Sequence, residues 1–114
     1  MSETKHSRDR IRELNDRMRT TFDPSLGRVI VTSGVDALSA NDKAAAIAKV
    51  KAFSTFDRDN DPNGEHDFGS FEIAGEMFFW KIDYYDRSLE FGSEDPANPS
   101  KTMRVLTLML AEEY

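Results

Sequence analysis

The chain has 114 residues, which fits one domain, and 39% of them are hydrophobic, so a packed core is expected. It contains no cysteine, which excludes disulfides and cysteine-based zinc or nucleophile chemistry. No apolar run approaches the roughly 20 residues of a membrane helix, so we expect a cytoplasmic protein with no membrane partner.

The net charge of −6 is distributed unevenly along the chain. Residues 1–20 hold six Lys or Arg against four Asp or Glu, a net of +2. Residues 57–95 hold twelve acidic residues against three basic ones, a net of −9. Such a surface repels phosphates, so direct nucleic-acid binding is not expected. A protein partner with a basic surface, or a cation, fits it better.

The first expected element is an amphipathic helix after a disordered tail of residues 1–6. Its apolar residues recur every three or four positions: Ile11, Leu14 and Met18. We expect the helix to end near Thr20, because Asp23-Pro24 disfavours its continuation. Residues 7–114 are expected to form a single domain.

A short strand and a second helix come next. The β-branched run of residues 28–32 predicts the strand. Ser39 with Asp42 three residues later predicts a helix start, because a serine side chain there can accept a backbone N–H. This helix is expected to run to about Phe53.

Residues 57–67, DRDNDPNGEHD, predict a polar loop. Part of it matches the first half of a calcium-binding loop: Asp59, Asp61, Asn63 and Gly64. The second half does not match, because Ser70 occupies the position of the bidentate glutamate. The favoured interpretation is a turn whose Asp and Asn side chains bond its own backbone.

Three strand-like runs follow, at residues 67–73, 76–85 and 88–91. If Ala74-Gly75 is a two-residue hairpin turn, Gly69 lies opposite Trp80 and leaves room for the indole. If Asp86-Arg87 is a second turn, β-pairing would align residues 82–85 with residues 88–91. Both turns place the large apolar side chains on one face, which supports the register.

The last expected element is a helix from about Ser100, with Met103, Leu106 and Leu110 on one face. The predicted fold class is therefore α+β. We expect an antiparallel β-meander of three to four strands with helices packed on one face.

The other face of this meander carries the predicted site. The register aligns His66, Asp83 and Glu90 across three strands, where neighbouring Cβ atoms are about 5 Å apart. Such a row could support His/Asp acid–base catalysis or hold a divalent cation as cofactor. The candidate catalytic residues are His66, Asp83, Glu90 and Lys81, and the candidate binding residues are Glu65, Asp67, Tyr85 and Asp86. A solvated sheet face explains the same pattern.

Three apolar residues share that polar face: Phe68, Met77 and Phe79. They indicate that the first helix or a partner partly covers it, and they suggest homo-oligomerisation as a further hypothesis.

Three segments have a distinctive sequence: residues 60–72, NDPNGEHDFGSFE; residues 79–96, FWKIDYYDRSLEFGSEDP; and residues 104–114, RVLTLMLAEEY. They resemble an uncharacterised small-protein family of alphaproteobacteria, a domain of unknown function often carried on plasmids and mobile elements. The likeness covers Ile11 to Tyr114. It implies a bacterial cytoplasmic protein, accessory to a mobile element, and brings no activity with it.

Two functions are compatible with these features. The first is a protein-binding or accessory module, for example an inhibitor of host defence that mimics nucleic acid with its acidic surface. The alternative is a small metal-dependent or His/Asp-based hydrolase with its site on the sheet face, which metal analysis of the purified protein would test.

Overall fold

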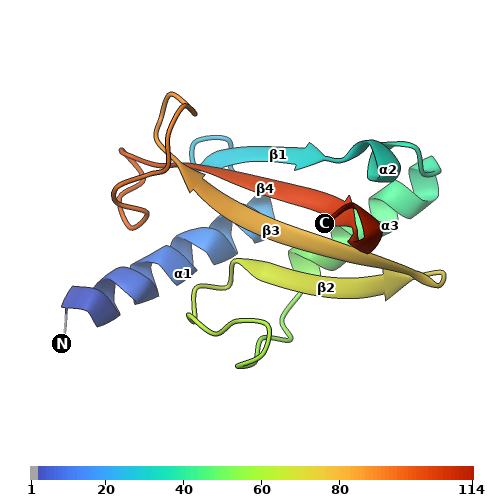
Figure 1. Ribbon diagram of the computed structural model, residues 1–114, viewed down its shortest axis with the longest axis horizontal. Coiled ribbons are helices and arrows are strands. Elements are labelled where there is room, and N and C mark those ends of the chain that lie inside the picture. Colours follow the sequence, from blue (N-terminus) through green and yellow to red (C-terminus); the bar gives the residue numbers. More distant parts are fainter. Residues whose placement is uncertain (1–2) are drawn as a thin grey trace.

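A four-stranded mixed sheet with helices on one face forms the structure (Figure 1). The computed structural model describes the chain from residue 3 to residue 114, with side chains from residue 7. The helices are α1 (Glu3–Thr21), α2 (Ser33–Asp36) and α3 (Ala40–Ala52), and the strands are β1 (Gly27–Val31), β2 (Phe68–Ile73), β3 (Glu76–Tyr85) and β4 (Met103–Leu110), followed by a 3-10 turn, η1 (Ala111–Glu113). The strand order is β1-β4-β3-β2, and only β1 and β4 run parallel. The predicted α+β class is confirmed.

Helix α1 packs as its apolar stripe predicts. Ile11, Leu14 and Met18 are all buried. The helix closes at Phe22, which has a positive φ of 56° and donates its N–H to the Met18 carbonyl. The predicted tail lies partly outside the described residues, and from Glu3 onward the backbone is helical.

Strand β1 and helix α3 confirm the next two predictions. The side chain of Ser39 accepts the backbone N–H of Asp42 at 3.1 Å, which is the expected N-cap. Ala46 and Val50 face the core from α3. Figure 1 shows α1 and α3 behind the sheet, on the face that Trp80 occupies. None of the described helices combines the length and apolarity that crossing a bilayer requires.

The β2–β3 hairpin has the predicted register. Phe68 pairs with Lys81, and Gly69 with Trp80. Ala74 and Gly75 both have positive φ angles, 52° and 83°, which matches a type I′ turn between twisted strands.

The second neighbour of β3 differs from the prediction. Residues 103–110 form strand β4 and not a helix, and β4 takes the place beside β3 that residues 88–91 were predicted to fill. Burial explains the difference, because alternate β4 residues from Arg104 to Leu110 face the helices while Met103 and Met109 are buried on the opposite side. A short apolar run buried on both faces fits helical and strand periodicity equally well.

The predicted strand at residues 88–91 is wrong for a local reason. The Asp86 carboxylate accepts the Ser88 hydroxyl at 2.8 Å and the Glu90 N–H at 3.1 Å, so it closes a turn. Leu89 takes a positive φ of 63° and donates its N–H to the Asp86 carbonyl. Phe91 is therefore exposed and does not pair with Ile82.

Candidate functional site

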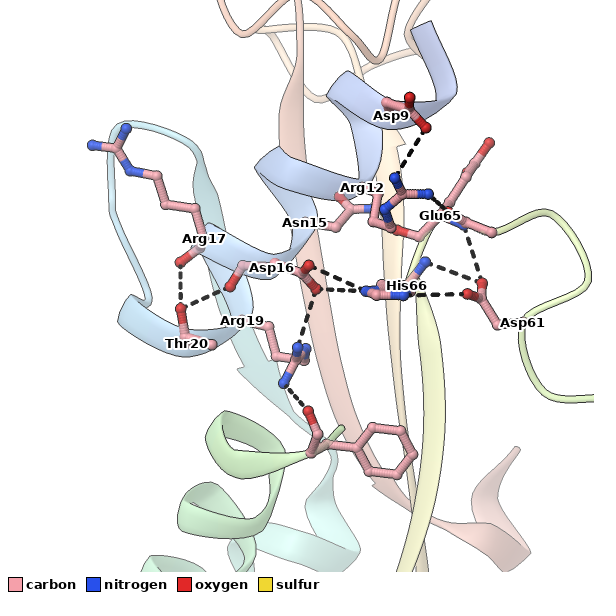
Figure 2. A network of polar contacts seen from close by, with 12 residues as sticks. Asp9, Arg12, Asn15, Asp16, Arg17, Arg19, Thr20, Asp61, Glu65 and His66 are labelled. Atoms are coloured by element: carbon pink, nitrogen blue, oxygen red, sulfur yellow. Dashed lines mark hydrogen bonds and ion pairs between the residues drawn. The ribbon is translucent and has the colours of Figure 1, made fainter. Parts of the chain in front are cut away.

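His66 lies between α1 and the loop before β2 (Figure 2). Its Nδ1 is 2.9 Å and 3.1 Å from the two carboxylate oxygens of Asp16 on α1. Its Nε2 is 3.7 Å from Oδ2 of Asp61. The ring stacks on Phe56 with 3.8 Å between the ring centroids and 3° between the planes. Both ring nitrogens thus face carboxylates, and the imidazole ties the loop to the helix.

The loop itself folds around Asp61. One carboxylate oxygen of Asp61 accepts the N–H groups of Glu65 and His66, at 3.1 Å and 3.0 Å. A carboxylate oxygen of Asp57 accepts the N–H groups of Asp59 and Asn60 in the same way. These contacts agree with the turn interpretation of residues 57–67, because the acidic side chains bond the loop's own backbone.

The predicted row of His66, Asp83 and Glu90 does not form. His66 has a positive φ of 55°, which breaks the strand alternation and turns its ring to the helix side of the sheet. Asp83 points to the other side, lies opposite Val105 and bonds Lys81 at 2.8 Å. Glu90 belongs to the turn after β3. Among the side chains that the structure describes, no group of three or more His, Asp or Glu residues is arranged to hold a metal ion.

The predicted binding residues are scattered by this geometry. Glu65 accepts the Tyr84 hydroxyl at 2.7 Å on the helix side. Asp67 is half-buried beside β2, and Tyr85 ends β3 opposite Met103. Asp86 closes the turn described above. Their functional roles, and those of Lys81, Asp83 and Glu90, remain predictions.

A buried polar cluster was missed by the sequence interpretation. The Arg104 side chain is fully buried, and its Nε donates to Asn15 Oδ1 at 2.6 Å. The Asn15 amide in turn donates to the Tyr84 hydroxyl at 2.8 Å and to the Glu65 carbonyl at 3.0 Å. Burial lowers the pKa of Arg104 and raises that of Tyr84, because it disfavours the charged form of each. The sequence feature that could have revealed this cluster is Asn15, a polar residue on the apolar side of α1 next to Leu14.

A second buried arginine links the two helices. Arg19 donates to the carbonyls of Val50 and Phe53, at 3.0 Å and 2.8 Å, and so satisfies the C-terminal end of α3. It also bonds Asp16 at 3.1 Å, the same carboxylate that contacts His66. The network in Figure 2 therefore joins α1, α3 and the loop of residues 57–67, and its contacts hold the fold together.

Asp67 makes the stability of this region depend on pH. Burial raises the pKa of its carboxyl, and the Glu65 and Asp61 carboxylates add to the effect. The folded state then holds this proton more tightly than the unfolded state. The protonated carboxyl therefore contributes to the free energy of unfolding fully below pH 3.8, and this contribution is lost as the pH rises through the raised pKa. Asp67→Asn is therefore expected to raise the melting temperature at neutral pH, and the gain should vanish in acid.

The matched control for Asp67 is Asp86→Asn. Hydrogen bonds from Ser88 and from the Glu90 N–H lower the pKa of Asp86, so its contribution is present at neutral pH and is lost in acid. This variant should lower the melting temperature at neutral pH. Thermal melts at several pH values measure both effects. Equal changes in melting temperature for the two variants would contradict the opposite pKa shifts of Asp67 and Asp86.

A highly exposed aromatic side chain lies in the turn after β3, at the upper left in Figure 1. Phe91 is 72% exposed there. A surface groove of about 460 Å³ adjoins it, and its lining residues are Asp86, Phe91, Gly92, Glu94 and Lys101. An aromatic ring, carboxylates and a groove thus meet on one short segment, residues 86–94, which we call the Phe91 loop.

The Phe91 loop is held in place at both ends. Asp86 donates its N–H to the Phe91 carbonyl at 2.8 Å, and Ser93 donates its N–H to the Tyr84 carbonyl at 3.1 Å. Arg87 donates to three backbone carbonyls, those of Ser25, Pro99 and Thr102. The loop therefore presents Phe91 from a fixed backbone.

Comparison with known proteins identifies a family and no activity. Residues 31–113 match a family described as "Protein of unknown function (DUF3768)". No significant match was found among curated proteins or among solved structures. The matched residues include α3, the hairpin, the Phe91 loop and β4. Because the match spans well over half of the sequence, the chain belongs to the DUF3768 family of proteins of unknown function.

Proposed function

We propose that the protein is a binding module that docks a basic protein partner through the Phe91 loop. The observation that carries the proposal is an aromatic ring, 72% exposed, on a turn whose backbone is bonded on both sides. Buried aromatic anchors contribute most of the binding energy at protein interfaces. A loop that is already ordered also loses little conformational entropy when it binds.

The surroundings of Phe91 favour a basic partner. Asp86 and Glu94 line the adjoining groove, Glu90 is exposed on the same turn, and Lys101 is the basic lining residue. A Lys or Arg of the partner in this groove would meet carboxylates and the face of the Phe91 ring, which attracts cations. The remaining acidic surface would speed association and make it sensitive to salt.

The biological setting is a further part of the proposal. The resemblance to alphaproteobacterial proteins on plasmids and mobile elements supports a cytoplasmic accessory role on such an element. An inhibitor of host defence is one form, in which the acidic loop occupies a basic, nucleic-acid-binding surface of the partner. The hydrolase alternative has less support, because both ring nitrogens of His66 already face carboxylates.

The test uses a tagged protein to capture partners from an extract of the cell that encodes it, at low salt. The identified partner is then purified, and its affinity is measured for wild type, Phe91→Ala and Met77→Ala. Met77 is the control, because it is an exposed apolar residue far along β3 from the Phe91 loop. We expect Phe91→Ala to weaken binding about tenfold to a hundredfold and Met77→Ala to leave it unchanged.

Two results would count against this function. One is a captured partner without a basic surface whose affinity does not fall as salt is added. The other is equal affinity of wild type and Phe91→Ala for the purified partner.

A further inference from the structure

The face of the sheet turned away from α1 and α3 carries a second ordered surface. Strand pairing places side chains of β1, β4 and β3 on it in two rows. The rows are Arg28, Val105 and Asp83, and Ile30, Thr107 and Lys81. We call these six residues the open-face patch. None of them is buried, and Ile30 is 50% exposed.

The neighbouring part of this face is covered by the chain itself. The ring of Tyr114 lies 6.1 Å from that of Phe68 and 5.3 Å from that of Phe79, between ring centroids. The prediction that the first helix covers these residues is wrong, because α1 packs on the opposite face. Tyr114 thus covers part of this face beside β2, and the open-face patch lies next to it on β1, β4 and β3.

The charged residues of the patch lie on both sides of β4. Arg28 and Asp83 flank the same residue, Val105, from the two neighbouring strands. Asp83 uses one oxygen to bond Lys81 at 2.8 Å. Arg28 is exposed and forms no ion pair with any side chain that the structure describes. The patch thus holds an unpaired cation and a carboxylate in one row, with β4 between them.

We infer that the open-face patch is the interface of a homodimer. A two-fold axis along β4, between two facing sheets, exchanges the β1 side with the β3 side. Each Arg28 then lies over Asp83 of the second copy, and each Ile30 over the aliphatic stem of Lys81. Val105 and Thr107 meet their own counterparts on the axis. A two-fold interface requires this self-complementarity, and sheets that pack face to face lie about 10 Å apart.

The charge distribution favours a second copy of this chain as the molecule that covers the open-face patch. With a net charge of −6, two copies repel each other over most of their surface. On the open-face patch, by contrast, the two-fold axis brings opposite charges together in both Arg28–Asp83 pairs. Three strands spaced about 4.8 Å apart make a small interface, so we expect a weak dimer that forms at high protein concentration.

The experiment is sedimentation velocity of the purified chain over a range of concentrations at low salt. We expect wild type to shift from monomer to dimer, and Ile30→Asp to remain monomeric. Phe91→Ala should dimerise as wild type does, since it lies outside the patch. This control also separates the dimer from the proposed partner binding, because each can fail while the other holds.

Charge reversal gives the sharper test. Arg28→Glu alone and Asp83→Lys alone each place like charges in both pairs, so each variant should be monomeric. An equal mixture of the two should dimerise again, because each pair then joins opposite charges. A wild type that is monomeric at every concentration would overturn the inference. So would a dimer that survives both single substitutions, or a mixture that stays monomeric.

Discussion

Replacing Trp80 with alanine is expected to lower the free energy of unfolding by about 3–5 kcal/mol. The Trp80 side chain has no exposed surface and lies at the centre of the core between the sheet and the two long helices. Its ring meets Phe53 edge-on at 5.6 Å between centroids, and the Arg19 guanidinium lies 5.4 Å from it. Alanine would leave a cavity at the point where α1, α3 and β3 meet. Urea unfolding followed by circular dichroism measures the loss.

Gly69 supplies the control for Trp80. A Cβ atom at this position would overlap the indole and the Phe53 ring, so Gly69→Ala is expected to cost about 1–3 kcal/mol by overpacking. In a Trp80→Phe background the smaller ring leaves space, and the same substitution should cost much less. Additive effects of the two substitutions would show that Trp80 does not fill the space above Gly69.

The register of the β2–β3 hairpin was predicted correctly, and the close fit of Gly69 against Trp80 is one reason. The Ala74-Gly75 turn and the alternation around it are local, so the register of β2 against β3 could be predicted from adjacent sequence. Gly69 opposite Trp80 was predictable because a large ring needs an empty position across the ladder. Helix α3 was likewise predictable from its N-cap.

Strand β4 could not be predicted in this way. Its partners are β1 in parallel and β3 in antiparallel orientation, both reached through long connections. Nothing near residues 103–110 indicates those pairings, and the apolar run alone allows a helix. With residues 103–110 taken as a helix, residues 88–91 were the strand next in sequence that could pair with the free side of β3.

The predicted His66 row failed for a different reason. Alternation assumes extended backbone, and His66 takes a positive φ because the Asp61 carboxylate binds the N–H groups of Glu65 and His66. A single residue in that conformation moves a side chain to the other face of the sheet. His66 does lie among carboxylates. Those of Asp16 and Asp61 come from α1 and the loop, not from the neighbouring strands.

Arg104 is the buried residue for which we expect the other large effect. Arg104→Ala should lower the free energy of unfolding by about 3–5 kcal/mol, because it leaves a large cavity and two acceptors without their donor. The substitution removes the bonds to Asn15 Oδ1 and to the Pro96 carbonyl, each 2.6 Å long. Both acceptors would then lie unpaired in a cavity, and the Tyr84 ring would lose the guanidinium 5.3 Å from its centre.

The Arg104→Met variant distinguishes the loss of the buried charge from the loss of side-chain volume. Methionine occupies much of the volume and removes a buried cation whose Nη1 has no hydrogen-bond partner among the described residues. Its cost should therefore be smaller than that of alanine, about 1–3 kcal/mol from the unpaired acceptors. Arg58→Ala is the exposed control and should change stability by less than about 0.5 kcal/mol. If Arg104→Ala were as harmless as Arg58→Ala in denaturant unfolding, the Asn15–Arg104 contact would not stabilise the packing of α1 on β4.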